Sequence, residues 1–317
     1  GSQAKRRARA VIVDHLTPPL TRAETYGPLA ELEQLVDEYY EAAGVDPRRL
    51  AVLRDDILEL TRSTGLDKDS DVSATDEPDA ALAKLDNYLC ELKEMQIRDG
   101  LHVFGVAPEG RLLTDLLVAL ARVPRLQGEN GDASLIRALA ADFGLSGGEN
   151  GFDPLDCEMG APWTGPRPNG LVNGQTWRSK GDTVELLENL AAQLVSGQAV
   201  PDPEWRQTRA VLEIIAADIR PAVTASGAAE TSGVLTALDG RFVEPGPSGA
   251  PTRGRTDVLP TGRNFYSLDS RTVPTPAAWQ LGWKSAARLL DHHRQTHGRW
   301  PRRLALSAWG TSNMRTG

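Results

Sequence analysis

A long stretch rich in glycine, proline and arginine constrains this chain more than any other feature. It runs from Glu244 to Arg271 and holds too many glycines and prolines for a helix or an ordinary strand. Structureless loops longer than about 12–15 residues are usually functional or disordered. The second half of the stretch contains residues that are atypical of a solvated tether: Asn264, Phe265, Tyr266 and Leu268. We therefore expect an ordered loop.

Four arginines punctuate this loop, each beside a Gly, Ser or Thr: Arg253, Arg255, Arg263 and Arg271. Guanidinium groups next to exposed backbone N–H groups suit a ligand with several carboxylates or phosphates. Residue types alone leave two interpretations open. The stretch is either an anion-binding loop or an ordered surface loop without a ligand.

Composition limits the class of protein and its partners. The 317 residues are enough for two domains with cores, and 40% hydrophobic residues is ordinary for a soluble globular protein. A net charge of −8 disfavours nucleic acid and anionic membranes as partners, and we expect neither. Two cysteines, Cys90 and Cys157, imply no disulfide framework and favour a reducing compartment, the cytoplasm. No apolar run in the sequence is long enough for a membrane span, and we expect no signal peptide.

Both ends of the sequence suggest a piece of a larger protein. Gly1 and Ser2 resemble the remnant of a protease site. Residues 304–310, with the sequence LALSAWG, are typical of a buried strand. We expect this strand to begin an α/β unit that the chain contains only in part.

Apolar periodicity predicts helices over residues 29–44, 48–64, 75–100, 108–120, 132–143, 183–196, 203–225, 228–238 and 275–297. Asp46-Pro47 and Thr275-Pro276 each supply a helix cap and a first-turn proline. Residues 11–13 are a short β-like run. The Gly/Pro-rich residues 144–177 contain Trp163 and Trp177, which favours a packed lid over a flexible linker.

The predicted fold class is mixed α/β and helix-dominated. We expect a helical region over residues 1–143, a lid loop with helices over 144–240, and the arginine loop, a helix and a strand over 241–317.

Histidines are candidate site residues because they serve as both bases and metal ligands. His293 and His297 share a helix face with His292 nearby, and a solvated helix end is favoured over a metal site there. His102 and His15 each fit either a base or a loop-packing residue. The sequence has no nucleophile elbow, Walker loop or dinucleotide fingerprint, so we expect no motif in this chain to bind ATP.

The segment from Thr256 to Asp269 (TDVLPTGRNFYSLD) resembles a signature of the large subunit of aerobic cobaltochelatase, which is similar to the magnesium-chelatase large subunit. Residues 14–19, 101–105, 246–254 and 307–315 extend the resemblance over almost the whole chain. The resemblance implies a subunit that binds a tetrapyrrole and the substrate metal, Co(II). It also implies two partners, a ring-forming AAA+ ATPase subunit and a second companion subunit, which use ATP and Mg.

In that family the complex inserts Co(II) into hydrogenobyrinic acid a,c-diamide during cobalamin biosynthesis. This corrinoid carries several carboxylates around an apolar ring, which gives the arginine loop a purpose. The expected rim contacts are Arg253, Arg255, Arg263 and Arg271. The expected ring-packing residues are Phe265, Tyr266 and Trp309, with Asn264 and Asn313 as orienting donors.

Metal insertion also needs a base near the ring centre to remove N–H protons. The candidates are His102, Asp269 and Asp257, and no metal ligand is assigned. The family's His- and Glu-bearing segment has no counterpart here and is expected upstream, so the chain by itself is expected to be inactive.

Two alternative functions remain. The helical first two-thirds could dock the ATPase subunits while the loop connects domains. The protein could instead be a magnesium chelatase acting on protoporphyrin IX, whose two carboxylates need fewer arginines.

Overall fold

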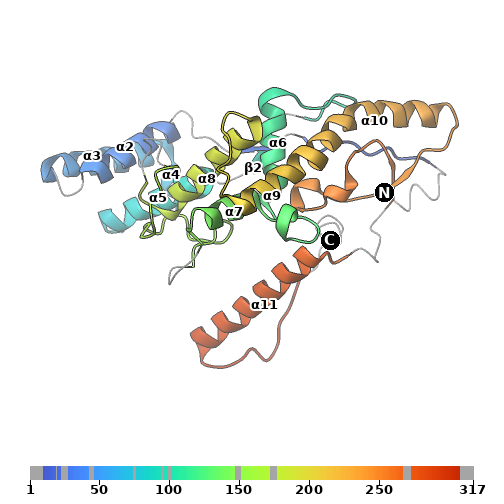
Figure 1. Cartoon of the computed structure of the whole chain (residues 1–317). Coiled ribbons are helices and arrows are strands. Elements are labelled where there is room, and N and C mark those ends of the chain that lie inside the picture. The colour runs from blue at the N-terminus through green and yellow to red at the C-terminus, as the bar shows by residue number, and fades with distance from the viewer. Residues whose placement is uncertain are drawn as a thin grey trace. The chain divides into compact units, whose positions relative to one another are not determined.

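The computed structural model is helix-dominated, as predicted (Figure 1). It divides into two compact units. It describes residues 10–18, 20–22, 28–42, 46–73, 76–93, 96–98, 101–146, 151–171, 177–266 and 273–307. Unit 1 combines residues 1–20, 98–142 and 191–317, and unit 2 combines residues 21–97 and 143–190. The units interleave along the chain, whereas the three regions expected from composition are consecutive. Among the described helices, none is long and apolar enough to cross a membrane.

Unit 2 is built on α2 (Pro28–Ala42), α3 (Pro47–Thr64), α4 (Leu66–Asp69) and α5 (Pro78–Lys93). The predicted cap of α3 is confirmed, because the Asp46 side chain accepts hydrogen bonds from the backbone N–H groups of Arg48 and Arg49. Gly65 ends the same helix with a φ of 76°, a left-handed conformation that favours glycine.

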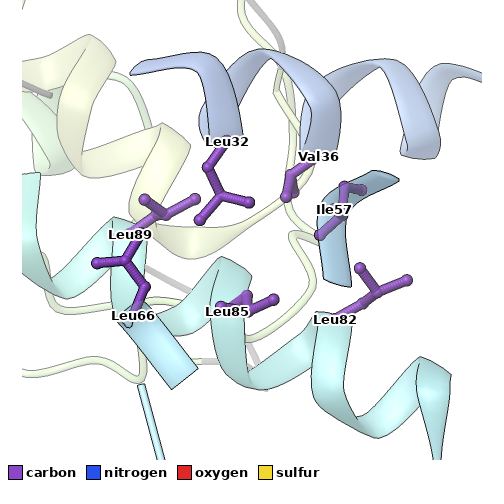
Figure 2. Close-up of a cluster of buried hydrophobic side chains, with 7 residues drawn as sticks. All are labelled: Leu32, Val36, Ile57, Leu66, Leu82, Leu85 and Leu89. Carbon is purple, nitrogen blue, oxygen red and sulfur yellow. The ribbon is translucent and has the colours of Figure 1, made fainter. Parts of the chain in front are cut away.

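The apolar stripes of these helices meet in one buried cluster (Figure 2): Leu32, Val36, Ile57, Leu66, Leu82, Leu85 and Leu89. The members on α2 and α5 follow the three- and four-residue spacing of one helix face. Burial of these faces against one another holds unit 2 together.

The Gly/Pro-rich residues also pack in unit 2. Trp163 and Trp177 are both buried, and their rings stack with centroids 6.2 Å apart. Phe152 meets Trp163 edge to face at 5.0 Å, and the Trp177 indole N–H donates to Thr183 Oγ1 at 2.8 Å. The prediction of a packed segment is confirmed. Its role as a lid stays a prediction.

Unit 1 contains α6 (Gly110–Arg122), α7 (Leu135–Asp142), α9 (Arg206–Ile214), α10 (Arg220–Leu238) and α11 (Pro276–His297), and the chain passes between the units within α8 (Lys180–Ser196). Short helical turns are η1 (Asn130–Asp132), η2 (Ile215–Ile219), η3 (Pro251–Arg253) and η4 (Thr256–Val258). The strands are β1 (Leu20–Arg22), β2 (Gln96–Arg98), β3 (Pro245–Pro247) and β4 (Asn264–Tyr266). β1 pairs with β2, and β3 runs parallel to β4 with Gly246 opposite Phe265.

Two predicted helix boundaries are wrong. The helix expected over residues 75–100 ends at Lys93, and Gln96 lies in β2 instead. The break expected between residues 225 and 228 does not exist, because α10 runs unbroken from Arg220 to Leu238 and follows α9 directly through η2. Gly227 lies in the interval where the break was expected, and its role is described below.

The last helix, α11, has the predicted cap, since Thr275 Oγ1 accepts a hydrogen bond from the Ala278 N–H at 3.2 Å. None of the α11 residues is buried, and Trp279 and Trp283 are exposed. The described part of the strand expected over residues 304–310 is neither a strand nor buried in this chain, because Leu306 is 90% exposed.

Candidate functional site

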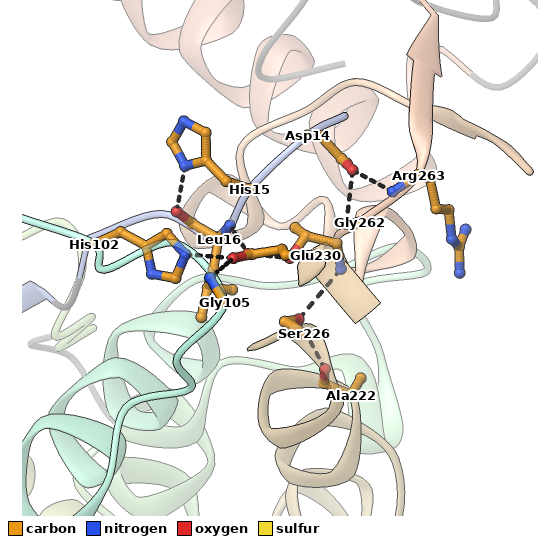
Figure 3. A network of polar contacts seen from close by, with 11 residues as sticks. Asp14, His15, Leu16, His102, Gly105, Ala222, Ser226, Glu230, Gly262 and Arg263 are labelled. Atoms are coloured by element: carbon orange, nitrogen blue, oxygen red, sulfur yellow. Dashed lines mark hydrogen bonds and ion pairs between the residues drawn. The ribbon is translucent and has the colours of Figure 1, made fainter. Parts of the chain in front are cut away.

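One buried carboxylate on α10 draws three distant loops of unit 1 together (Figure 3). Glu230 Oε1 accepts hydrogen bonds from the Leu16 N–H at 2.6 Å and the Thr261 hydroxyl at 2.7 Å. Glu230 Oε2 lies 2.8 Å from both the Gly105 N–H and His102 Nε2. The loops around residues 16, 102–105 and 261 are therefore tied to one side chain.

The donors around Glu230 fix its charge. Burial alone raises the pKa of this carboxyl, but the hydrogen bonds from Gly105, His102, Thr261 and Leu16 outweigh burial, and the pKa lies below its ordinary value. An ionised carboxylate can only accept hydrogen bonds, so the His102 Nε2 carries the hydrogen that it shares with Glu230.

A second carboxylate, Asp14, clamps the arginine loop directly. Asp14 Oδ1 accepts hydrogen bonds from the Gly262 N–H at 2.9 Å and the Arg263 N–H at 2.6 Å. The Asp14 N–H donates to the Arg263 carbonyl at 3.0 Å. Burial raises the pKa of Asp14, an effect that the two backbone donors partly offset. Asp14 therefore sets the backbone of the loop at Arg263.

The residues just before Asp14 also hydrogen-bond to β4. Val13 forms an antiparallel bridge with Asn264, and the Phe265 N–H donates to the Ile12 carbonyl at 3.1 Å. The Asn264 side-chain oxygen accepts a hydrogen bond from the Ile12 N–H at 3.3 Å. The predicted β-like run at residues 11–13 thus serves as a short partner of β4.

Glycines on α10 let these loops lie directly on the helix. A Cβ at Gly227 would stand 2.6 Å from the Ala107 nitrogen, and one at Gly233 would stand 2.3 Å from the Gly262 oxygen. Either distance is shorter than van der Waals contact allows. The glycines in α10 therefore serve close packing rather than helix termination.

Two of the predicted site residues form an ion pair in which the arginine is buried and the carboxylate is partly exposed. Arg255 is 1% exposed, and its Nε and Nη2 each donate to a carboxylate oxygen of Asp257 at 2.8 Å. The hydrogen bonds to Asp257 raise the pKa of the guanidinium. Both oxygens of Asp257 are thus engaged by Arg255. The roles expected for the two residues, rim contact and base, stay predictions.

The other described arginines of the loop are more accessible. Arg253 is exposed, and Arg263 is partly buried with its aliphatic stem against Gly246, where a Cβ would meet Arg263 Cδ at 2.6 Å. Figure 3 shows the guanidinium of Arg263 pointing away from Asp14. The hydrogen bonds to Asp14 use the backbone N–H groups of Gly262 and Arg263, so an anion could pair with the guanidiniums without breaking them.

The remaining predicted contacts lie partly outside the described residues. Asn264, Phe265 and Tyr266 form β4, with Tyr266 39% exposed and Asn264 bonded to Ile12. The other four predicted residues fall outside the description: Asp269, Arg271, Trp309 and Asn313. The structure therefore brings His102 and the loop through Tyr266 to one region, around Glu230 and Asp14.

Two histidines stack beside Glu230. The rings of His15 and His102 are nearly parallel, at 8°, with centroids 5.6 Å apart. The His102 side chain is 5% exposed, whereas His15 is exposed to solvent. His15 Nδ1 lies 2.8 Å from the Leu16 carbonyl oxygen. In the part of the chain that is described, no group of three or more His, Cys, Asp or Glu side chains could hold a metal ion.

Sequence reasoning missed Glu230 and Asp14 as the organisers of this region. Glu230 is one polar residue among many in a predicted helix, so no local pattern singles it out. Asp14 stands out in the sequence only as the first of residues 14–19, one of the segments that extend the resemblance. Both act through contacts more than 200 residues apart in sequence, Leu16 with Glu230 and Asp14 with Arg263.

Comparisons with known proteins show what the chain is similar to. A family model described as CobN/Magnesium Chelatase matches residues 1–317. The aerobic cobaltochelatase subunit CobN of Sinorhizobium sp is 63% identical over 332 residues, covering 100% of this chain and 26% of the relative. The chloroplastic magnesium-chelatase subunit ChlH of Oryza sativa subsp. japonica is 29% identical, covering 99% of this chain and 24% of the relative.

A solved structure, the catalytic subunit of cobaltochelatase from Mycobacterium tuberculosis, is similar with a TM-score of 0.71 and 41% identity. The alignment covers 99% of this chain and 25% of that one. The chain thus spans about a quarter of the length of the relatives it matches.

Proposed function

Because the chain belongs to the CobN/magnesium chelatase family, we propose that it forms part of the macrocycle-binding region of a cobaltochelatase large subunit. The substrate is a metal-free corrinoid diamide and the substrate metal is Co(II). The observation that carries the proposal is how the described part of the arginine loop is held: Asp14 accepts from the Arg263 backbone N–H, and Glu230 accepts from the Thr261 hydroxyl.

The chemistry of the loop suits an acidic ring. Arg253 is exposed and Arg263 is partly exposed, and Tyr266, three residues after Arg263, offers an exposed aromatic ring. Arginines pair well with carboxylates, and aromatic faces pack on flat apolar rings. A loop fixed before binding loses little conformational entropy when a ligand arrives. Arg271, Asp269, Trp309 and Asn313 complete the proposed site.

Cobalt is favoured over magnesium as the substrate metal. Identity to the cobaltochelatase relative is 63%, against 29% to the plant magnesium-chelatase relative. A loop with four arginines also suits a corrinoid with several carboxylates better than protoporphyrin IX, which has two. We further propose that an AAA+ ATPase subunit and a second companion subunit use ATP and Mg to drive insertion, in the cytoplasm, for cobalamin biosynthesis.

A fluorescence titration tests the proposal. The chain is titrated with the metal-free corrinoid diamide, and quenching of tryptophan emission reports binding. Arg263→Ala is expected to weaken binding by about 10-fold or more, since a charge-assisted hydrogen bond contributes about 1.5–3 kcal/mol. Arg241→Ala is the matched control, because Arg241 is exposed and paired with Asp239 on the surface.

The same titration separates the alternatives. Equal or tighter binding of protoporphyrin IX would favour the magnesium-chelatase function. Binding of the ATPase subunits without any response to either tetrapyrrole would favour the docking function. Insertion itself is measured on the full-length protein with its partners, because this chain alone is expected to be inactive.

A further inference from the structure

We propose that His15 is the proton acceptor for a macrocycle N–H group during metal insertion. The proposal rests on the proposed function and deepens it by assigning a residue to one step. It stands on the position of the His15 ring, its hydrogen bond to Leu16 and its stacking on His102.

The hydrogen bond to Leu16 fixes which nitrogen of His15 is basic. A carbonyl oxygen can only accept, so His15 Nδ1 carries a hydrogen and donates it to the Leu16 oxygen at 2.8 Å. In the neutral ring, Nε2 therefore holds the free lone pair. Figure 3 shows this second nitrogen pointing away from Glu230, and the residue is exposed. A substrate can reach this lone pair from solvent.

The ring is also held in place, as a base must be. One face stacks on His102, whose own ring is fixed by the hydrogen bond from Nε2 to Glu230. The Leu16 backbone, which accepts from His15, is fixed by its N–H donation to the other oxygen of Glu230. The stacking partner of the His15 ring, His102, and the acceptor of its hydrogen bond, Leu16, are thus both held by Glu230.

The described alternatives are less available for proton transfer. His102 is 5% exposed and uses Nε2 on Glu230. Asp257 has both oxygens engaged by Arg255. His15 has an unengaged nitrogen among the described residues and an open path to solvent for the proton.

His15 also lies next to the loop that is proposed to bind the ring. Its chain neighbour Asp14 holds the Gly262 and Arg263 backbone, and Leu16 shares Glu230 with Thr261. The backbone of Arg263, a proposed rim contact, is thereby tied to the segment that carries His15.

The step balances without another reactant. The macrocycle N–H bond breaks and a bond between the hydrogen and His15 Nε2 forms, which leaves an electron pair on the ring nitrogen. That pair binds the incoming Co(II) ion. The resulting imidazolium at His15 then releases its proton to water, which returns the base to its starting form.

The test uses the full-length protein with its partner subunits, assayed for cobalt insertion and separately for corrinoid binding. His15→Ala is expected to lower kcat by about 100-fold or more, as for loss of a general base, while corrinoid affinity stays that of the wild type. Added imidazole is expected to restore insertion in His15→Ala, because it can enter the space left by the ring. His15→Gln keeps a polar side chain of similar reach and is expected to lower kcat as His15→Ala does. His292→Asn, at an exposed position on α11, is the control.

The outcomes are distinguishable. If His15→Ala inserts cobalt with the kcat of the wild type, the assignment of His15 is overturned but the proposed function is not. The same holds if kcat falls and added imidazole does not restore it. A loss of corrinoid affinity in His15→Ala at unchanged kcat also overturns it, since the residue would then serve binding. Failure of the wild-type protein to bind the corrinoid or insert cobalt overturns the proposed function itself.

Discussion

His102 Nε2 lies 2.8 Å from Glu230 Oε2, and the two side chains are 5% and 0% exposed. The pair joins a loop that follows β2 to a helix more than 100 residues later in the chain. Because Glu230 also holds Leu16 and Thr261, this one contact belongs to the network that shapes the whole candidate site.

Replacing Glu230 by alanine is expected to destabilise the chain by about 3 kcal/mol or more. The change leaves the buried Leu16 N–H, Gly105 N–H and Thr261 hydroxyl without their acceptor, at about 1–3 kcal/mol for each unsatisfied group. Urea unfolding followed by circular dichroism measures the loss. Glu213→Ala, at an exposed position on α9, is the control and is expected to stay within about 0.5 kcal/mol of the wild type.

Low pH is expected to remove the stabilisation that the ionised Glu230 side chain gives to the fold. The pKa of Glu230 is lower in the folded chain than its ordinary value of about 4.3. Its ionised form thus stabilises the fold above the ordinary pKa, and that contribution is lost as pH falls through the folded-state pKa. The stability difference between the wild type and Glu230→Gln, measured by urea unfolding from pH 7 to pH 3, should shrink on acidification. A difference that is constant or grows would contradict the assignment of an ionised Glu230.

Two helical glycines are expected to respond to alanine in opposite directions. Gly227→Ala on α10 places a Cβ 2.6 Å from the Ala107 nitrogen, so the loop must move and thermal stability should fall. Gly282→Ala on α11 meets no atom within 4 Å and should stabilise by up to about 1 kcal/mol through helix propensity. Thermal unfolding compares them. Equal stabilisation by both changes would contradict the close packing of the loop on α10.

That pair of glycines also shows how far the sequence could predict the fold. Helices with strong apolar periodicity and local caps, such as α3 with Asp46 and Gly65, follow from neighbouring residues alone. The break expected near Gly227 was wrong because the reason for that glycine is a loop more than 100 residues away. Patterns among neighbouring residues carry no information about contacts between residues that are distant in sequence.

Only part of the candidate site could likewise be predicted from the sequence. The arginine loop and His102 were predicted from residue types and from a resemblance to a family. Glu230 and Asp14 were not predicted, because their role depends on backbone N–H groups that are distant in sequence and meet them only in the folded chain. Sequence also could not separate the buried Arg255 from the exposed Arg253, since both stand beside glycine.

Those two arginines give a further prediction. Arg255→Ala removes both hydrogen bonds to Asp257 and opens a buried space, so it should destabilise the chain by about 2 kcal/mol or more. Arg253→Ala should stay within about 0.5 kcal/mol of the wild type and instead weaken corrinoid binding. Urea unfolding and the fluorescence titration measure the two effects. An Arg255→Ala protein as stable as the wild type would contradict a structural role for the buried guanidinium and its pairing with Asp257.

The central claim is that an acidic macrocycle binds where three loops meet on Glu230, and amide hydrogen exchange with and without the metal-free corrinoid diamide tests it most directly. Bound ligand is expected to slow exchange in residues 12–16, 101–106 and 261–266, since ligand binding suppresses local opening. The helices α2, α3 and α5 of unit 2 should exchange as before. Unchanged exchange in all three loops while the corrinoid is bound, or slowing confined to unit 2, would contradict the account.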